Sequence, residues 1–279
     1  MGRRTTRTTA VRVELTPEGV HTRARPDTVA VEEPLEIRVD GESLTTTMRT
    51  PGDDFDLALG WLLGEEAIGG AADVATMMHC TDVDEDGRPT FNVVDVSLAP
   101  GVRLSPGVSA RRSVTTSACG ICGSDSIEAI LQRARADIRA DDTPLSPEVL
   151  TGLVDTMRGQ QRSFDRTGGV HAAALFSAEG ELLCIREDVG RHNAVDKVLG
   201  WAAREDRRPG IARVLLVSGR AGFELVQKCV MAGIPTMAAV SAPTSLAVDL
   251  AEQAGLTLVG FLRPPNFTVY SGSYRLNLP

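Results

Sequence analysis

Continuous apolar runs alternate with amphipathic segments from residue 169 to the end of the chain. Five runs predict β-strands, the first two on either side of a turn at Glu179–Gly180: GVHAAALFS, ELLCIRED, RVLLVSG, IPTMAAVS and LTLVGFLR. Three intervening segments have the apolar spacing of helices: GRHNAVDKVLGWAARE, AGFELVQKCVMAG and APTSLAVDLAEQAG. Strands that are apolar throughout and alternate with helices indicate a largely parallel sheet covered on both faces.

Residues 1–112 have a shorter and more polar pattern. The segments VRVEL, LEIRV and LTTTM predict short strands, and the last two flank a turn at Asp40–Gly41. Further along, DVATMMHCTDVDEDGRPTFNVVDVSL reads as a hairpin that turns on Asp86–Gly87. Between these pieces, DDFDLALGWLLGEEAI has helical spacing, and Asp53 or Asp54 is expected to cap its N-terminus. The pattern predicts an α+β part rich in antiparallel strands.

A polar, glycine-rich stretch, SVTTSACGICGS, separates this part from the rest. After it we expect one helix from Ser124 or Asp125 onward. A second helix, SPEVLTGLVDTMRGQQRSF, should begin with Ser146 as its N-cap and Pro147 at its first position. The predicted organisation is therefore a strand-rich α+β N-terminal domain over residues 1–112, a loop over 113–124 that is expected to be mobile, and an α/β domain over 125–279. The overall class is α/β, or α+β for the chain as a whole.

Composition places the 279-residue chain among globular proteins, with 42% hydrophobic and 24% charged residues. The formal net charge of −8 gives no general attraction to nucleic acid or to anionic lipid. No apolar run reaches the roughly 18–20 residues of a membrane helix. The paired arginines of MGRRTTRTTAVRVEL lack a following apolar region, so no export signal is expected. We expect a cytoplasmic protein without nucleic-acid or membrane partners.

Five cysteines in a chain of this size do not resemble a secreted disulfide framework. Cys184 and Cys229 lie in apolar runs and are interpreted as small buried hydrophobic residues. Cys119 and Cys122 differ from them, because they form a Cys-x-x-Cys pair among glycines and polar residues. Such a pair alone is compatible with a metal clip, a redox switch or a nucleophile.

The surrounding sequence favours the nucleophile. A metal clip would need His79 and Cys80 as further ligands, yet adjacent strand residues point to opposite faces, so no resident metal is predicted. A thioredoxin-like role is disfavoured because the pair does not follow a strand of a βαβ unit. A helix that begins near Ser124 would favour the thiolate form of Cys119 through its dipole.

Two loops that lead from strands into helices combine glycine with arginine. They contain Gly190, Arg191, His192 and Asn193 in one case, and Ser218, Gly219 and Arg220 in the other. Ligands of open α/β sheets bind where strands end and helix N-termini begin, and free N–H groups there favour anions. Neither loop matches a standard nucleotide motif. An anionic ligand and ordinary solvated turns both remain compatible with the pattern.

The residues around His171 argue against a zinc deaminase, and a histidine that holds a strand end or contacts a ligand fits the sequence better. Deaminase chemistry needs His-x-Glu and Pro-Cys-x-x-Cys, whereas His171 is followed by two alanines and no Pro-Cys-x-x-Cys occurs. The proton-shuttling carboxylate and two metal ligands are missing.

Seven segments together resemble a known family: EEPLEIRVDGE, MRTPGDDFDLALGWLLGE, TTSACGICG, TGGVHAAAL, REDVGRHNAVDKVLGW, VSGRAGFELVQKCVMAGIP and VSAPTSLAVDLAE. They run from about residue 32 to 263, and the family is that of the FdhD-type formate dehydrogenase accessory sulfurtransferases. The resemblance implies a C-terminal domain with a cytidine deaminase-like α/β fold. It also implies transfer of persulfide sulfur from a cysteine desulfurase to a molybdenum (or tungsten) bis(molybdopterin guanine dinucleotide) cofactor. The cofactor is a bound substrate that then enters formate dehydrogenase.

The resemblance also implies roles for individual residues. The sulfur carrier maps onto Cys119, with Cys122 assisting. The cofactor contact after the last strand maps onto six residues: Phe261, Leu262, Arg263, Pro264, Pro265 and Asn266. The two prolines depart from the small or basic residues expected there. Two pterin–guanine units in the cofactor are compatible with a homodimer. The alternative function is a non-catalytic cofactor-binding chaperone whose cysteine pair is structural.

Overall fold

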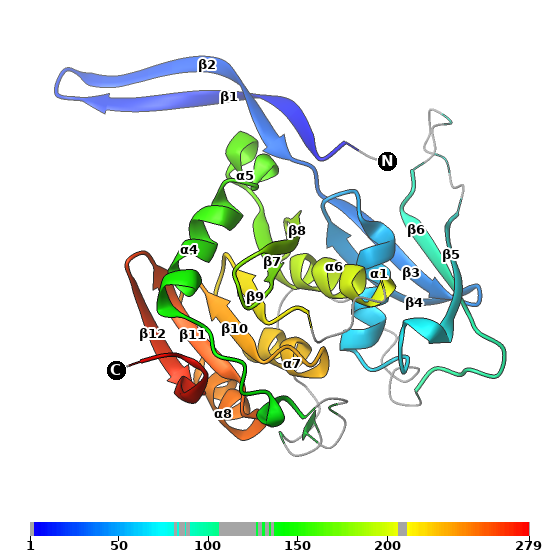
Figure 1. Ribbon diagram of the computed structural model, residues 1–279. Coiled ribbons are helices and arrows are strands. Elements are labelled where there is room, and N and C mark those ends of the chain that lie inside the picture. Colours follow the sequence, from blue (N-terminus) through cyan, green and yellow to red (C-terminus); the bar gives the residue numbers. More distant parts are fainter. Residues whose placement is uncertain are drawn as a thin grey trace.

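The computed structural model describes residues 3–80, 83, 87, 90–105, 127, 130–131, 134, 137–205 and 211–278. Within these ranges the chain forms two β-sheets joined by packed helices and a long two-stranded ribbon that projects from the body (Figure 1). The predicted domain boundaries near residues 112 and 124 lie outside the described residues, as do Cys119 and Cys122.

The larger sheet has six strands in the order β12-β11-β10-β9-β7-β8. Their bounds are β7 His171–Phe176, β8 Leu182–Asp188, β9 Val214–Val217, β10 Thr236–Ala239, β11 Thr257–Arg263 and β12 Asn266–Ser271. The centre, β9-β10-β11, is parallel, whereas β7, β8 and β12 pair antiparallel with their neighbours. The α/β class is thus confirmed. The sheet is mixed rather than largely parallel, because of the described pairings only β9–β10 and β10–β11 are parallel, whereas β7–β8, β7–β9 and β11–β12 are antiparallel.

Helices cover both faces of this sheet. They are α4 Pro147–Arg158, α5 Arg162–Thr167, α6 Arg191–Arg204, α7 Phe223–Met231 and α8 Ser245–Ala254. Alternate residues of one strand enter different cores: Ala173 and Leu175 of β7 pack with α6, α7 and α8, whereas Phe176 packs with α4. This burial on both sides explains why the strands read as continuous apolar runs.

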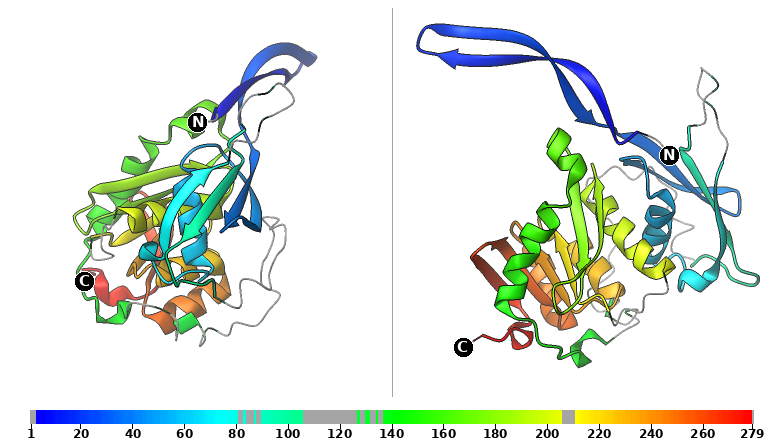
Figure 2. Two further views of the ribbon diagram at one scale, coloured as in Figure 1. Left: turned by 90° about the vertical axis from the view of Figure 1, so that its right-hand side faces the viewer. Right: turned by 45° about the horizontal axis from the view of Figure 1, so that its top comes forward.

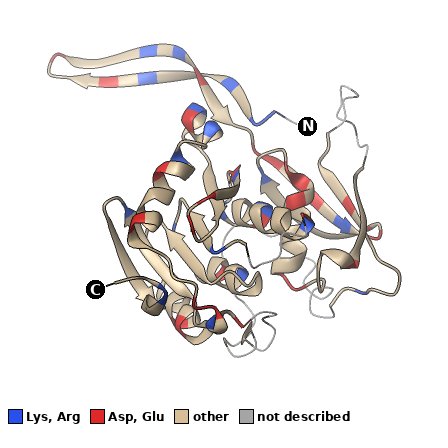
Figure 3. Ribbon diagram, in the orientation of Figure 1, with Lys and Arg blue, Asp and Glu red and all other residues tan. Residues whose placement is uncertain are grey.

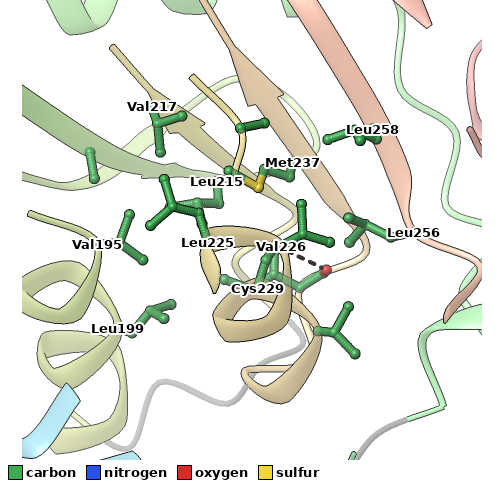
Figure 4. Packing of buried hydrophobic residues seen from close by; sticks show 14 of the residues in the cluster. Val195, Leu199, Leu215, Val217, Leu225, Val226, Cys229, Met237, Leu256 and Leu258 are labelled. Atoms are coloured by element: carbon green, nitrogen blue, oxygen red, sulfur yellow. Dashed lines mark hydrogen bonds between the residues drawn. The ribbon is translucent and has the colours of Figure 1, made fainter. Parts of the chain in front are cut away.

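Cys229 of α7 lies in the first of these cores, together with Val226 and Leu256 (Figure 4). Its side chain is fully buried, and burial raises the pKa of its thiol. Burial also raises the pKa of the Cys184 thiol to about 12. The prediction that both cysteines act as small core residues is confirmed.

The smaller sheet has four strands in the order β4-β3-β6-β5, formed by β3 Glu33–Val39, β4 Glu42–Arg49, β5 Val74–His79 and β6 Val93–Leu98. The predicted turn between β3 and β4 is confirmed, since Asp40 and Gly41 both have positive φ, as a tight hairpin turn requires. Helix α1, Asp54–Gly64, packs its Leu57 and Leu62 on this sheet.

Helix α1 also packs against α6, and two glycines allow their backbones to touch. A Cβ added to Gly60 would lie 1.9 Å from the carbonyl oxygen of Asp196, and a Cβ added to Gly200 would lie 1.9 Å from that of Asp56. Ion pairs flank this crossing: Asp56 of α1 is 2.9 Å from Arg186 of β8 and 3.1 Å from Arg204 of α6. The N-terminal sheet is thereby attached, through α1, to helix α6, whose N-terminus lies at the candidate site.

The first two strands form the projecting ribbon, β1 Thr5–Thr16 and β2 Gly19–Ala30 (Figure 2). Both are longer than the short strand predicted around VRVEL. The sequence pattern did not show their length because neither face of most of the ribbon is buried, so regular alternation of apolar and polar residues is confined to the stretch around residues 11–15. Short 3₁₀ turns complete the described elements, at Ala71–Asp73, Ile138–Ala140 and Ser273–Arg275.

Helix boundaries were predicted with mixed success. Ser146 caps α4 as expected, accepting a hydrogen bond from the Val149 amide (3.1 Å), with Pro147 at the first position. The predicted continuation of this helix to Phe164 is wrong, because the chain breaks at Gly159 and resumes as α5. Asp53 precedes α1 but its carboxylate does not cap the helix, since it pairs with the guanidinium groups of Arg4 and Arg186 instead.

Candidate functional site at the edge of the sheet

The three predicted cofactor-contacting segments lie along one edge of the six-stranded sheet. The first follows β8, the second follows β9, and the third begins in the last residues of β11. Hydrogen bonds connect neighbouring loops: the Ser241 amide donates to Gly219, and the Phe261 amide donates to Ser241 (3.1 Å). Four interstrand spacings of about 4.8 Å separate β8 from β11, so the edge extends over roughly 19 Å.

The first segment, Gly190–Asn193, is held in place by the buried carboxylate of Asp188. This carboxylate accepts hydrogen bonds from the Gly190 amide (2.9 Å) and from the Asn193 side chain (3.1 Å). It also accepts from the Thr50 amide (3.1 Å) and pairs with Lys197 (2.7 Å). Asp188 and Lys197 are almost completely inaccessible, at 0% and 1% exposure.

Asn193 therefore holds this segment in position. Its side-chain amide also donates to the Met48 carbonyl (2.7 Å), and its oxygen accepts from the Thr47 hydroxyl (3.2 Å). Since its side chain is buried and bonded at both ends, Asn193 fixes the loop against β4. A ligand at this loop would meet the side chain of Arg191 and the backbone.

The second segment, Ser218–Arg220, is positioned by β7. The Ser218 hydroxyl accepts from the Ala172 amide (2.9 Å), and Gly219 lies beside the ring of His171. Burial lowers the pKa of His171, and the positive charge of Arg191 lowers it further. His171 is consequently neutral near pH 7. Arg220 points to solvent.

The third segment, Phe261–Asn266, is the tip of a hairpin between β11 and β12, not a tail after the last strand. The sequence did not indicate β12, because the Pro264–Pro265 turn resembled a strand end and Asn266–Ser271 has no buried side chains. The Arg263 side chain donates to the Val240 carbonyl (3.2 Å), and Leu262 is buried. Phe261 has a φ of 49°, which is rare for an aromatic residue, and is 43% exposed. Such local strain often occurs at functional sites.

Three helices of the described part of the chain begin at this edge: α6, α7 and α8. Their N-cap residues, Gly190, Gly222 and Thr244, make no side-chain capping hydrogen bond. The loops before α7 and α8 are paired through Ala221 and Pro243. Aligned helix dipoles with open N–H groups attract anions. Within the described part of the chain, the guanidinium groups of Arg191 and Arg220 have no acidic partner, so they can add to this attraction.

His192 has a partner from the neighbouring helix. Its Nε2 lies 2.6 Å from a carboxylate oxygen of Glu224 in the first turn of α7. The contact joins the N-termini of α6 and α7 and places one acidic group among the open amides. His192 thus links the first predicted segment to the first turn of α7.

A cavity of about 480 Å³ opens beside the second segment, under α4 and α5. Its wall includes His171, Ser218, Val240 and Phe164, and most of the remaining lining comes from α4 and the glycines before β7. Sequence reasoning found Ser218 and considered His171. Asp188 was not predicted from the sequence. Its position, at the end of an apolar strand and just before the Gly-Arg-His-Asn loop, could have indicated a role in holding that loop.

The predicted sulfur carrier, Cys119, and the assisting Cys122 lie outside the described residues, so the structure does not place them relative to this edge. His79, considered as a metal ligand, stacks on Phe55 (4.8 Å between ring centres) and lies 3.9 Å from the Asp54 carboxylate. Across the ranges described above, no three acidic, histidine or cysteine side chains gather into a metal-binding group. In the same ranges no helix has the length and hydropathy of a membrane span.

Comparison with known proteins shows which family the chain belongs to. The model of the FdhD/NarQ family matches residues 30–277, which include all three segments and the region of the two cysteines. The chain belongs to the FdhD/NarQ family. Members with similar sequences include the sulfur carrier protein FdhD of Streptomyces avermitilis, which is 55% identical over 282 residues and covers 100% of this chain and 98% of that protein. The protein of the same name from Nocardia farcinica is 55% identical over 275 residues, covering 99% and 96%.

A solved structure supports the fold of this FdhD/NarQ member. A crystal structure from Desulfotalea psychrophila, of a protein described as a candidate formate dehydrogenase accessory protein, superposes with a TM-score of 0.72. The two sequences are 24% identical, and the match covers 97% of this chain and 99% of the other. The FdhD/NarQ chain therefore keeps the same overall arrangement of elements.

Proposed function

We propose that this protein is a sulfur carrier that serves formate dehydrogenase. The observation that carries the proposal is the match, over essentially the full chain, to relatives that are named sulfur carrier protein FdhD and are 55% identical. The described structure adds an edge with three open helix N-termini and two unpaired arginines, which suits a ligand with several phosphates.

In the proposed reaction, Cys119 receives sulfur and Cys122 assists its release. The Cys119 thiolate attacks the outer sulfur of a persulfide on a cysteine desulfurase, forming a new S–S bond while the desulfurase thiolate leaves. Attack of the Cys122 thiolate on Cys119 then forms a disulfide and expels the outer sulfur as hydrosulfide. The two thiols supply the two electrons that reduce the outer sulfur to hydrosulfide. A cellular thiol reductant then reduces the Cys119–Cys122 disulfide and restores both thiols.

The acceptor is proposed to be a molybdenum or tungsten bis(molybdopterin guanine dinucleotide), bound as a substrate. Its pyrophosphates would lie at the N-termini of α6, α7 and α8, near Arg191 and Arg220. Asp188 and Asn193 would hold the first loop in position, and neutral His171 would contribute no positive charge. We include in the proposal a symmetric dimer, matching the two guanine units of the cofactor, and a cytoplasmic location.

Reconstitution of formate dehydrogenase tests the proposal. Inactive enzyme is supplied with cofactor, desulfurase, cysteine and one variant of this protein. Cys119→Ala should abolish activation, whereas Cys80→Ala, which alters a half-exposed thiol of the described part, should activate like the parent. Both variants should bind guanosine diphosphate equally. Full activation by Cys119→Ala would refute the sulfur-carrier role.

Binding at the sheet edge can be tested separately. Replacing Arg191 and Arg220 by Gln removes two charge-assisted contacts and should weaken guanosine diphosphate binding by tenfold or more, by the usual worth of about 1.5–3 kcal/mol for each such contact. Unchanged affinity would show that the pyrophosphate does not lie at this edge.

A further inference from the structure

A second cavity, of about 580 Å³, lies on the other side of α5 from the sheet-edge cavity. Four arginines line it: Arg3, Arg4, Arg162 and Arg166. Its other polar lining residues are Thr5, Gln160, Ser163 and Glu187. Basic positions on α5 and at the start of the described chain are visible in blue in Figure 3. In a chain with a net charge of −8, such a concentration of positive charge in one cavity needs an explanation.

The acidic groups near this cavity are engaged elsewhere. The two oxygens of Glu187 accept the amides of Ser163 and Phe164, each at 2.8 Å, so this carboxylate caps α5. Asp53 pairs with Arg4. In the described ranges, Arg3, Arg162 and Arg166 have no acidic partner. Three guanidinium groups are therefore available to a ligand.

The arginines are held at the cavity by secondary structure. The Val31 amide donates to the Arg4 carbonyl (3.0 Å), which continues the β1–β2 ladder and fixes the start of the chain. Helix α5 packs against β1 and β2 and carries Arg162 and Arg166 one turn apart. Because residues four apart share one face of a helix, the two guanidinium groups can reach the same ligand.

We propose that this cavity binds a small oligophosphate, such as inorganic pyrophosphate or the polyphosphate group of a phosphorylated metabolite. Arginine binds phosphate oxygens in pairs of parallel hydrogen bonds, and the volume lies within the range of small-molecule sites. Among the described residues no aromatic side chain lines the cavity for base stacking, so the proposed recognition is directed at the phosphates. This site is separate from the sheet-edge site of the proposed function, and α5 forms a wall of both cavities.

Isothermal titration calorimetry of the full chain with pyrophosphate tests the proposal. The double variant Arg162→Gln, Arg166→Gln should lose at least about tenfold in affinity for this site, by the loss of charge-assisted hydrogen bonds. Arg12→Gln, an exposed arginine of the ribbon outside the cavity, is the matched control and should bind like the parent. Thermal unfolding of all variants checks that they remain folded.

The variant pair Arg191→Gln, Arg220→Gln distinguishes the two sites. If both sites bind pyrophosphate, each double variant should remove one equivalent and leave the other. Pyrophosphate binding that persists in full after loss of Arg162 and Arg166 would overturn the inference. Binding that disappears only with Arg191 and Arg220 would assign it to the sheet edge. A hexaglutamate peptide that binds when pyrophosphate does not would point instead to an acidic protein partner and would overturn the small-anion assignment.

Discussion

The backbone contact between α1 and α6 gives the most specific stability prediction. Gly60→Ala or Gly200→Ala would place a methyl group 1.9 Å from a carbonyl oxygen of the opposite helix. Real Cβ contacts are essentially never shorter than 3.0 Å, so the helices must separate locally by at least the difference of 1.1 Å. The obstacle is backbone, so no side-chain rotation can relieve it.

The expected cost follows from two opposing effects. Overpacking typically destabilises by about 1–3 kcal/mol, and a backbone obstacle should place these variants at or above the upper end. Alanine regains up to about 1 kcal/mol of helix propensity over glycine. We expect each variant to lose about 2–3 kcal/mol net. Separation would also weaken the contacts of Asp56 with Arg186 and Arg204.

Urea unfolding followed by tryptophan fluorescence measures this effect. The only two tryptophans, Trp61 and Trp201, lie on α1 and α6 and report on the crossing. Gly152→Ala is the matched control, because this glycine is in the exposed interior of α4 with nothing within 4 Å of the added Cβ. It should gain about 0.5–1 kcal/mol. If Gly60→Ala and Gly200→Ala match or exceed the parent protein in stability, the close contact between α1 and α6 is refuted.

Three further predictions concern buried groups. Lys197→Met should cost about 3–5 kcal/mol in urea unfolding, because it leaves the carboxylate of Asp188 buried without its cation; a loss below about 1 kcal/mol would contradict the pairing. The lowered pKa of His171 means that the unfolded chain binds the proton more readily, so folding stability should fall as pH drops below about 6.5. His171→Gln should flatten the dependence of the unfolding free energy on pH. An unchanged slope in this variant would show that His171 is not its source. Iodoacetamide at about pH 8 should leave Cys184 and Cys229 unmodified in the native protein but not in urea, since their thiol pKa values are raised; mass spectrometry of native protein with both modified would contradict their burial.

The α/β part could be predicted largely from sequence because its signals are local. Buried strands read as unbroken apolar runs, and Ser146 with Pro147 marks a helix start by its own chemistry. The Asp40–Gly41 turn likewise needs only two adjacent residues that tolerate positive φ. Glycine and arginine after strands pointed to the edge where the open helix N-termini lie. These features depend on neighbours within a few residues.

The parts that sequence did not reveal depend on distant partners. Asp53 would cap α1 in isolation, but Arg4, 49 residues away, takes its carboxylate. Asp188 has a role only because Thr50 and Lys197 surround it in the folded chain. Strand β12 has no buried side chain to produce a pattern and exists through its pairing with β11. Such contacts cannot be read from periodicity.

Mass spectrometry of this protein after incubation with a cysteine desulfurase and cysteine tests sulfur transfer most directly. We predict an adduct of about 32 Da, the mass of one sulfur atom, on the peptide that contains Cys119, removed by thiol reductant. Cys122→Ala should retain the adduct, and Cys119→Ala should lack it. Stoichiometric zinc with no adduct on the parent protein would contradict the sulfur-carrier role and favour a structural cysteine pair.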